Sequence, residues 1–266
     1  MKYFSDMINE QGNEIDFLKK IIHQITLEKI KPNKLIKGAL LTGSVARGDA
    51  RIGPYGIQID LALVLNKKED INLNELFGEN ISPKIPYHSV KIKDKIGLQI
   101  EVIEEKDLWS IREKPESVIF AKNEAIILDD KYDILSNWKK SHFIITSEDI
   151  KNRSLMHYFR YSYLTGDYRF EKWLYREALI QIEQNFHEAS ECYCYFLYCI
   201  NRMFIPRKDW LVYLTYEMEN KPERHSEYLD ILYTSHLNHD SIIQKNIIIK
   251  EIKAWMDNYV KSMNWI

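Results

Sequence analysis

Short blocks of hydrophobic and polar residues alternate along the first half of the chain. Residues 14–30 place isoleucine and leucine at helical spacing, and Lys31-Pro32-Asn33 ends the predicted helix. The apolar runs at 36–42 and 57–65 are short, and their β-branched and aliphatic residues predict buried strands. Helix and strand patterns in this order indicate an α+β domain.

The next segments continue this alternation. Residues 70–80 predict a short helix, and residues 86–93 and 97–104 predict two more strands. A helical pattern begins at Leu108. The segment AIILDDKYDIL, residues 125–135, predicts a strand, a turn and the start of a further strand.

The pattern changes near residue 140. Gly166 is the single glycine from there to the end, and helical spacing dominates. We predict helices over 149–164, 170–202, 207–219, 223–236 and 241–263. The expected fold class is therefore α+β, with a mixed-sheet domain over residues 1–140 and an α-helical bundle over residues 141–266.

Composition narrows the choice of partners. The 37 basic and 39 acidic residues give a net charge of -2, which provides no reason to expect DNA or RNA. The N-terminus has no apolar signal-peptide core, and no run reaches the ~20 apolar residues that span a bilayer. We expect a soluble, cytoplasmic protein with no nucleic-acid or membrane partner, and we leave its oligomeric state open.

The cysteines do not indicate a disulfide framework or a metal site. Cys192, Cys194 and Cys199 lie in one run, ECYCYFLYC, and no second Cys or His pair stands at zinc-binding distance. We interpret them as small apolar residues on a buried helix.

Candidate chemistry lies between the two strongest strand patterns. Gly43-Ser44 follows the first of these strands, and a glycine there lets the backbone approach a ligand closely. Amides and a hydroxyl at such a turn hold phosphate oxygens. Asp60 lies inside the apolar run of the second strand, where a charge requires a metal ion or a cation as partner.

These residues resemble the signature of the DNA polymerase β-like nucleotidyltransferases, and especially the small antibiotic-modifying adenylyltransferases. Gly43-Ser44, the loop Arg47-Gly48-Asp49 and the strand with Asp60 carry the resemblance. It implies a nucleotidyltransferase fold in which Gly43, Ser44 and Arg47 bind the nucleotide. It also implies that Asp60, with Glu101 on a neighbouring strand, is a catalytic carboxylate that holds two divalent ions, expected to be Mg²⁺.

One position departs from that pattern. The resemblance implies a first carboxylate two residues before Asp60, where this chain has Gln58. The expected metal ligands are then Asp60, Glu101 and Gln58, with two negative charges in place of three. Asp49 in the loop is a candidate to compensate for the missing charge.

The helical half contributes a weaker resemblance. The stretch NRMFIPRKDWLVYL resembles a motif of the helical domains of these enzymes, which implies that Lys208 reaches the triphosphate. Glu177, Glu183 and Glu188 are candidates for the base that deprotonates an acceptor hydroxyl.

Three functions remain open at this point. The first is a metal-dependent transfer of a nucleoside monophosphate, expected to be AMP from ATP, to a hydroxyl of a small molecule of aminoglycoside or lincosamide type. The second is a degenerate relative that binds nucleotide or a protein partner without catalysis, which Gln58 supports. The third is an antitoxin that adenylylates its toxin, although such proteins are usually shorter.

Overall fold

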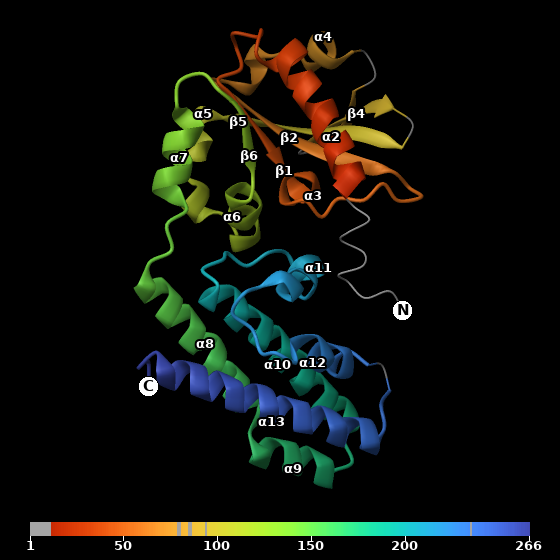
Figure 1. Ribbon diagram of the computed structural model, residues 1–266, viewed down its shortest axis with the longest axis vertical. Helices are drawn as coiled ribbons and strands as arrows, with labels where there is room; N and C mark the ends of the chain where they lie inside the picture. Colours follow the sequence, from red (N-terminus) through yellow and green to blue (C-terminus); the bar gives the residue numbers. More distant parts are fainter. Residues whose placement is uncertain (1–11, 79–80, 85–86, 94, 235) are drawn as a thin grey trace. The chain divides into compact units, whose positions relative to one another are not determined.

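The computed structural model describes residues 12–78, 81–84, 87–93, 95–234 and 236–266 (Figure 1). The chain divides into two units, Met1–Ile144 and Ile145–Ile266. The division falls four residues after the expected boundary at residue 140. The first unit contains a mixed sheet and the second is helical, which confirms the predicted α+β class.

The sheet of the first unit has the order β3-β4-β5-β2-β1-β6 among the described residues. Strands β2 and β5 are parallel, and the other neighbours are antiparallel. The strand bounds are β1 Gly38–Thr42, β2 Ile57–Leu65, β3 Ser82–Lys84, β4 Tyr87–Lys93, β5 Ile96–Glu104 and β6 Ile126–Asp130. Strand β2 coincides with its predicted range, since a buried parallel neighbour favours a continuous apolar run.

One face of the sheet packs against the first described helix, α2 (Gly12–Ile25), which continues as the π-helical turn η1 (Thr26–Ile30). Ile15, Leu18 and Ile22 of α2 share a core cluster with β2 and β5 residues such as Leu61 and Ile100. Leu61 and Ile100 lie directly opposite each other in the parallel register. This packing confirms the predicted helix over 14–30 and leaves the alternate strand positions on the opposite face.

Short helices follow the strands. They are α3 Gly43–Arg47, η2 Lys68–Asp70, α4 Leu73–Phe77, α5 Glu105–Leu108, η3 Ile111–Glu113, α6 Glu116–Asn123 and α7 Ile134–His142. Helices α5, α6 and α7 lie on the opposite side of the sheet from α2 (Figure 1). The indole Nε1 of buried Trp138 on α7 donates to the carbonyl of Leu108 on α5 at 2.7 Å.

The predicted strand start after the turn at Asp130 is wrong, because α7 begins there. The Asp130 carboxylate accepts hydrogen bonds from the backbone N–H groups of Leu135 at 3.1 Å and Ser136 at 2.8 Å. It therefore satisfies amides that the first turn of a helix leaves without intrahelical partners. The apolar pair Ile134-Leu135 then packs as part of a helix.

The second unit consists of helices. They are α8 Ser147–Thr165, α9 Asp167–Tyr175, α10 Leu179–Ile200, α11 Lys208–Leu211, η4 Tyr213–Glu217, α12 His225–Leu232 and α13 His239–Ser262. Its core is aromatic, with Tyr161, Tyr193, Phe196 and Tyr198 fully buried. Cys192, Cys194 and Cys199 are buried on α10 and form no disulfide, as predicted.

Two of the predicted helices of this unit are interrupted. The range 170–202 covers most of α9 and all of α10, because Glu177 between them adopts a left-handed φ of 54° that no helix continues through. The range 207–219 contains α11 followed by the 3-10 turn η4. Apolar spacing alone did not reveal either interruption.

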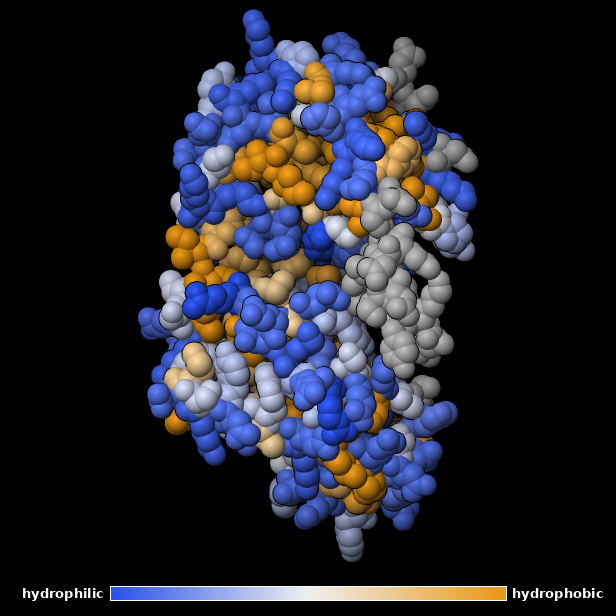
Figure 2. Space-filling model, viewed as in Figure 1, coloured by the Kyte–Doolittle hydropathy of each residue, from blue (hydrophilic) through white to orange (hydrophobic). Residues whose placement is uncertain are grey.

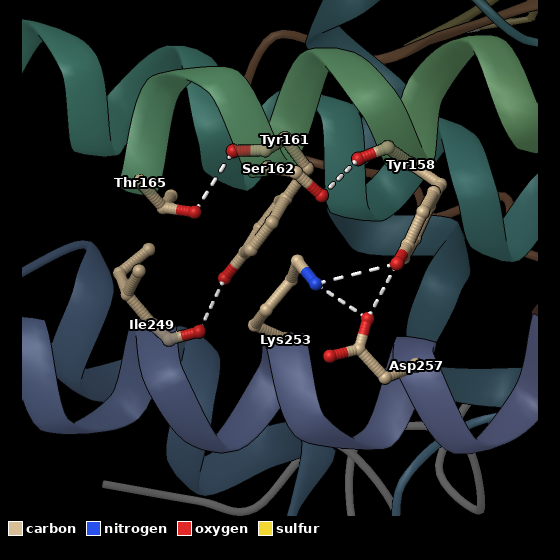
Figure 3. A network of polar contacts seen from close by, with 7 residues as sticks. All are labelled: Tyr158, Tyr161, Ser162, Thr165, Ile249, Lys253 and Asp257. Atoms are coloured by element: carbon tan, nitrogen blue, oxygen red, sulfur yellow. Dashed lines mark hydrogen bonds and ion pairs between the residues drawn. The ribbon is translucent and has the colours of Figure 1, made fainter. Parts of the chain in front are cut away.

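A polar network joins α8 to α13 (Figure 3). The hydroxyl of Tyr158 donates to Asp257 Oδ1 at 2.7 Å, and Lys253 forms an ion pair with the same oxygen. Burial opposes ionisation of Asp257, but the hydrogen bonds from Lys253 and Tyr158 outweigh it and lower the pKa of Asp257. The hydroxyl of Tyr161 donates to the carbonyl of Ile249 at 2.8 Å.

No helix in the described part of the chain is long and apolar enough to cross a membrane. Hydrophilic residues cover most of the face drawn in Figure 2, with hydrophobic patches between them.

Candidate nucleotide site

The turn after β1 and the carboxylate of Asp60 lie in contact. Thr42 at the end of β1 pairs with Asp60 of β2, and Gly43 then begins α3 with a φ of 68°. A Cβ at Gly43 would lie 2.0 Å from Asp60 Oδ2, so no side chain fits there while the carboxylate keeps its place. The backbone conformation and the space both require glycine. The structure thus brings together two residues that stand seventeen positions apart in the sequence.

Ser44 follows at the same turn. Its carbonyl accepts hydrogen bonds from the amides of Gly48 and Asp49, each at 3.0 Å, which closes the loop after α3. Within the described residues, its hydroxyl makes no hydrogen bond to the protein. Ser44 is half-buried, and its hydroxyl remains available for a ligand oxygen.

The residues predicted as metal ligands share one face of the sheet. In the parallel register, Asp60 lies opposite Gln99 and Gln58 lies opposite Gly97. Glu101 is two residues beyond Gln99, so its Cα lies about 8 Å from that of Asp60 by strand geometry. This face is opposite to the one that α2 covers. The predicted alternation of these side chains therefore agrees with the observed register.

Gln58 lies on the backbone of the neighbouring strand. A Cβ at Gly97 would approach the Gln58 side-chain oxygen to 2.4 Å and the nitrogen to 2.6 Å. The amide thus covers Gly97 and contributes no charge. Glycine at position 97 is what leaves room for it.

Glu101 is paired with a lysine that the sequence did not suggest. Lys122 on α6 donates a hydrogen bond to Glu101 Oε2, and the two form an ion pair. The Lys122 side chain is 8% exposed and that of Glu101 is 32% exposed. The α6 sequence ESVIFAKN indicates only that Lys122 follows a short apolar run, which is compatible with a buried position. Which acceptor it meets depends on tertiary packing.

Arg47 and Asp49 pair with each other at the edge of the turn. Arg47 Nε donates to Asp49 Oδ2 at 3.2 Å, and both side chains are largely buried. Burial raises the pKa of Asp49, while the Arg47 charge and hydrogen bond act in the opposite direction. Asp49 is thus engaged by Arg47, which weakens the idea that it replaces the carboxylate missing at position 58.

A pair of divalent ions does not fit this set of donors. Among the described residues, no group of three or more His, Cys, Asp or Glu side chains is arranged to hold a metal ion. Glu101 is neutralised by Lys122, and the Gln58 amide rests on Gly97. One Mg²⁺ fits better, because this ion often binds through one carboxylate, water and the phosphates of a nucleotide.

Lys208 lies in the second unit and is paired there. Its ammonium is 2.9 Å from both carboxylate oxygens of Glu191, and its side chain is 73% exposed. The nearby Asn201 side chain binds the backbone of Asn220. A ligand of Lys208 would therefore compete with Glu191.

The three candidate bases have different environments. Glu183 pairs with the buried Lys245, and Glu188 pairs with Arg160. Glu177 occupies the break between α9 and α10. These ion pairs give Glu183 and Glu188 structural partners.

Comparisons with known proteins found little. No protein-family profile and no curated protein matches the chain. A solved structure of a nucleotidyltransferase-like protein from Exiguobacterium sibiricum is similar, with 10% sequence identity and a TM-score of 0.45 over 92% of this chain and 78% of that one. A likeness of this degree does not decide function.

Proposed function

We propose that the first unit binds a nucleoside triphosphate, expected to be ATP, at the turn Gly43-Ser44 beside Asp60. The observation that carries the proposal is the contact between Gly43 and the Asp60 carboxylate. It brings a phosphate-holding type of turn next to a side chain able to hold the Mg²⁺ of a Mg–nucleotide complex. The Ser44 hydroxyl would donate to a phosphate oxygen.

Transfer of a nucleoside monophosphate is a second candidate function. The arrangement of Asp60 and Glu101 on one face of β2 and β5 favours it. The acceptor would be a hydroxyl of a small molecule, and Mg²⁺ bound with the nucleotide would stabilise charge on the phosphates. Gln58 and the Lys122–Glu101 pair weigh against it, because they leave too little negative charge for two ions. We therefore rank nucleotide binding first.

Calorimetric titration with ATP, with and without Mg²⁺, tests the binding proposal. We expect binding that strengthens with Mg²⁺ and weakens in Ser44→Ala. Transfer is tested separately by pyrophosphate release in the presence of aminoglycoside and lincosamide acceptors. Absence of binding for ATP, GTP, CTP and UTP under both conditions would contradict the proposal and direct attention to a protein partner.

A further inference from the structure

Helix α8 carries apolar and aromatic side chains on two opposite faces. One face is buried, and from it Tyr158 and Tyr161 point toward α13 (Figure 3). The opposite face exposes Met156, Phe159 and Tyr163, at 59%, 56% and 57% respectively. A helix on a protein surface normally has one apolar stripe and a polar outer face, so this second stripe calls for a partner.

The exposed stripe has the spacing of a seam between two helices. Asn152, Met156, Phe159 and Tyr163 follow one another at intervals of four, three and four residues, which is the a and d spacing of a coiled coil. The spacing is the same when it is read from either end. Two antiparallel copies of α8 would therefore place Met156 opposite Phe159 and Asn152 opposite Tyr163. Each contact would occur twice about a twofold axis, as in an isologous dimer.

The two ends of the stripe carry opposite charges. Glu148 is exposed in the first turn of α8. At the other end, the guanidinium of Arg169 lies 4.0 Å from the centre of the Tyr163 ring. Neither Glu148 nor Arg169 forms an ion pair within the described part of the chain. Antiparallel pairing brings the acidic end of one copy to the basic end of the other, and it also aligns the two helix dipoles favourably.

We propose that α8 pairs antiparallel with α8 of a second copy of this chain. A large side chain buries about 150–250 Å², so the exposed parts of Met156, Phe159 and Tyr163 offer about 300 Å² per copy. Two copies then bury about 600 Å² through the stripe, to which the flanking residues add, whereas stable interfaces bury about 1,200 Å² or more. We therefore expect a reversible dimer with a dissociation constant in the micromolar range. This inference does not depend on the proposed nucleotide binding.

A different protein or a single-stranded nucleic acid is the competing occupant of the stripe. Bases could stack on Phe159 and Tyr163, but the phosphates would be repelled by Glu148 at the other end. A partner of another sequence would require neither a spacing that reads the same in both directions nor opposite charges at the two ends. Both features are requirements of self-association, and for this reason a second copy is the favoured occupant.

Sedimentation velocity of the full-length protein, from about 1 to 100 µM, tests the inference. We expect the sedimentation coefficient to rise with concentration from that of a monomer to that of a dimer. Phe159→Glu places a carboxylate in the seam twice and should weaken dimerisation by about 100-fold or more. Tyr55→Glu is the matched control, because Tyr55 is a fully exposed aromatic residue of the first unit, and this variant should dimerise as the unaltered protein does.

Charge reversal tests the antiparallel arrangement. Glu148→Arg and Arg169→Glu each place like charges at both ends of the seam, and each should weaken dimerisation by about tenfold. The double variant Glu148→Arg/Arg169→Glu restores opposite charges and should recover the affinity. Thermal unfolding verifies that every variant is folded, since Glu148→Arg also removes an acidic residue from the first turn of a helix.

A chain that stays monomeric up to about 100 µM would overturn the inference and leave the stripe to another protein or a nucleic acid. A dimer that survives Phe159→Glu would also contradict it, because the interface would then lie elsewhere. If the double variant dimerises no better than the single charge reversals, the antiparallel pairing is wrong.

Discussion

The contact between Gly43 and Asp60 permits a sharp test of the site. Gly43→Ala places a methyl carbon 2.0 Å from Asp60 Oδ2, whereas carbon and neighbouring heavy atoms pack at about 3.5 Å. The carboxylate must therefore move by about 1.5 Å, or the turn must shift. The left-handed φ of 68° adds a conformational cost of about 1–2 kcal/mol for alanine.

We expect Gly43→Ala to weaken Mg–ATP by about tenfold or more, which corresponds to about 1.4 kcal/mol. Isothermal titration calorimetry measures this affinity. Gly53→Ala is the matched control, because a Cβ at Gly53 meets nothing within 4 Å. Because the backbone strain lowers stability as well, thermal unfolding of both variants is needed to verify that they are folded at the titration temperature.

A folded Gly43→Ala protein that binds Mg–ATP as tightly as Gly53→Ala does would contradict this prediction. Phosphates would then not bind at the turn beside Asp60, and the site would have to be sought elsewhere. Equal loss in both variants would show that the loop as a whole matters and that the Gly43–Asp60 contact does not.

Three further predictions concern the second unit. Burial lowers the pKa of His225 from its ordinary 6.5 to about 4, so the protein takes up a proton when it unfolds between these pH values. The free energy of unfolding should therefore fall by about 3 kcal/mol as the pH decreases from 6.5 to 4. Urea titrations of His225→Asn should lack this part of the pH dependence. Tyr158→Phe removes the 2.7 Å hydrogen bond to Asp257 and should cost about 1 kcal/mol in urea unfolding, whereas an unchanged midpoint would show that water replaces it. Lys208→Met should change stability by less than about 1 kcal/mol, because the Lys208 side chain is 73% exposed. A loss of ATP affinity in calorimetry would reveal a ligand role, and unchanged affinity would refute the role implied by the resemblance.

The local pattern of apolar and polar residues was sufficient to predict the main helices and strands of the first unit. The apolar run of β2 predicted its bounds, because a strand buried beside a parallel neighbour selects a continuous aliphatic segment. The position of Gly43 directly after β1 and of Asp60 within β2 also follows from sequence order and strand alternation. These features depend on a residue's neighbours in the chain, which the sequence displays.

The same pattern did not predict where helices begin or are interrupted. Glu177 interrupts a continuous helical pattern with a positive φ, and Asp130 converts an apparent strand start into α7 through its carboxylate. In both places the apolar spacing is compatible with the wrong element. Backbone conformation and hydrogen bonds to single side chains determine which element forms there.

The α+β class, the turn at Gly43 and the amide at Gln58 could be predicted from the sequence, because periodicity and residue type are local properties. The contact between Asp60 and Gly43 and the ion pair between Lys122 and Glu101 arise only when the chain folds. Those pairings join residues from separate elements. A lysine in a helix carries no sign of which carboxylate it will meet until the helix has packed against the sheet.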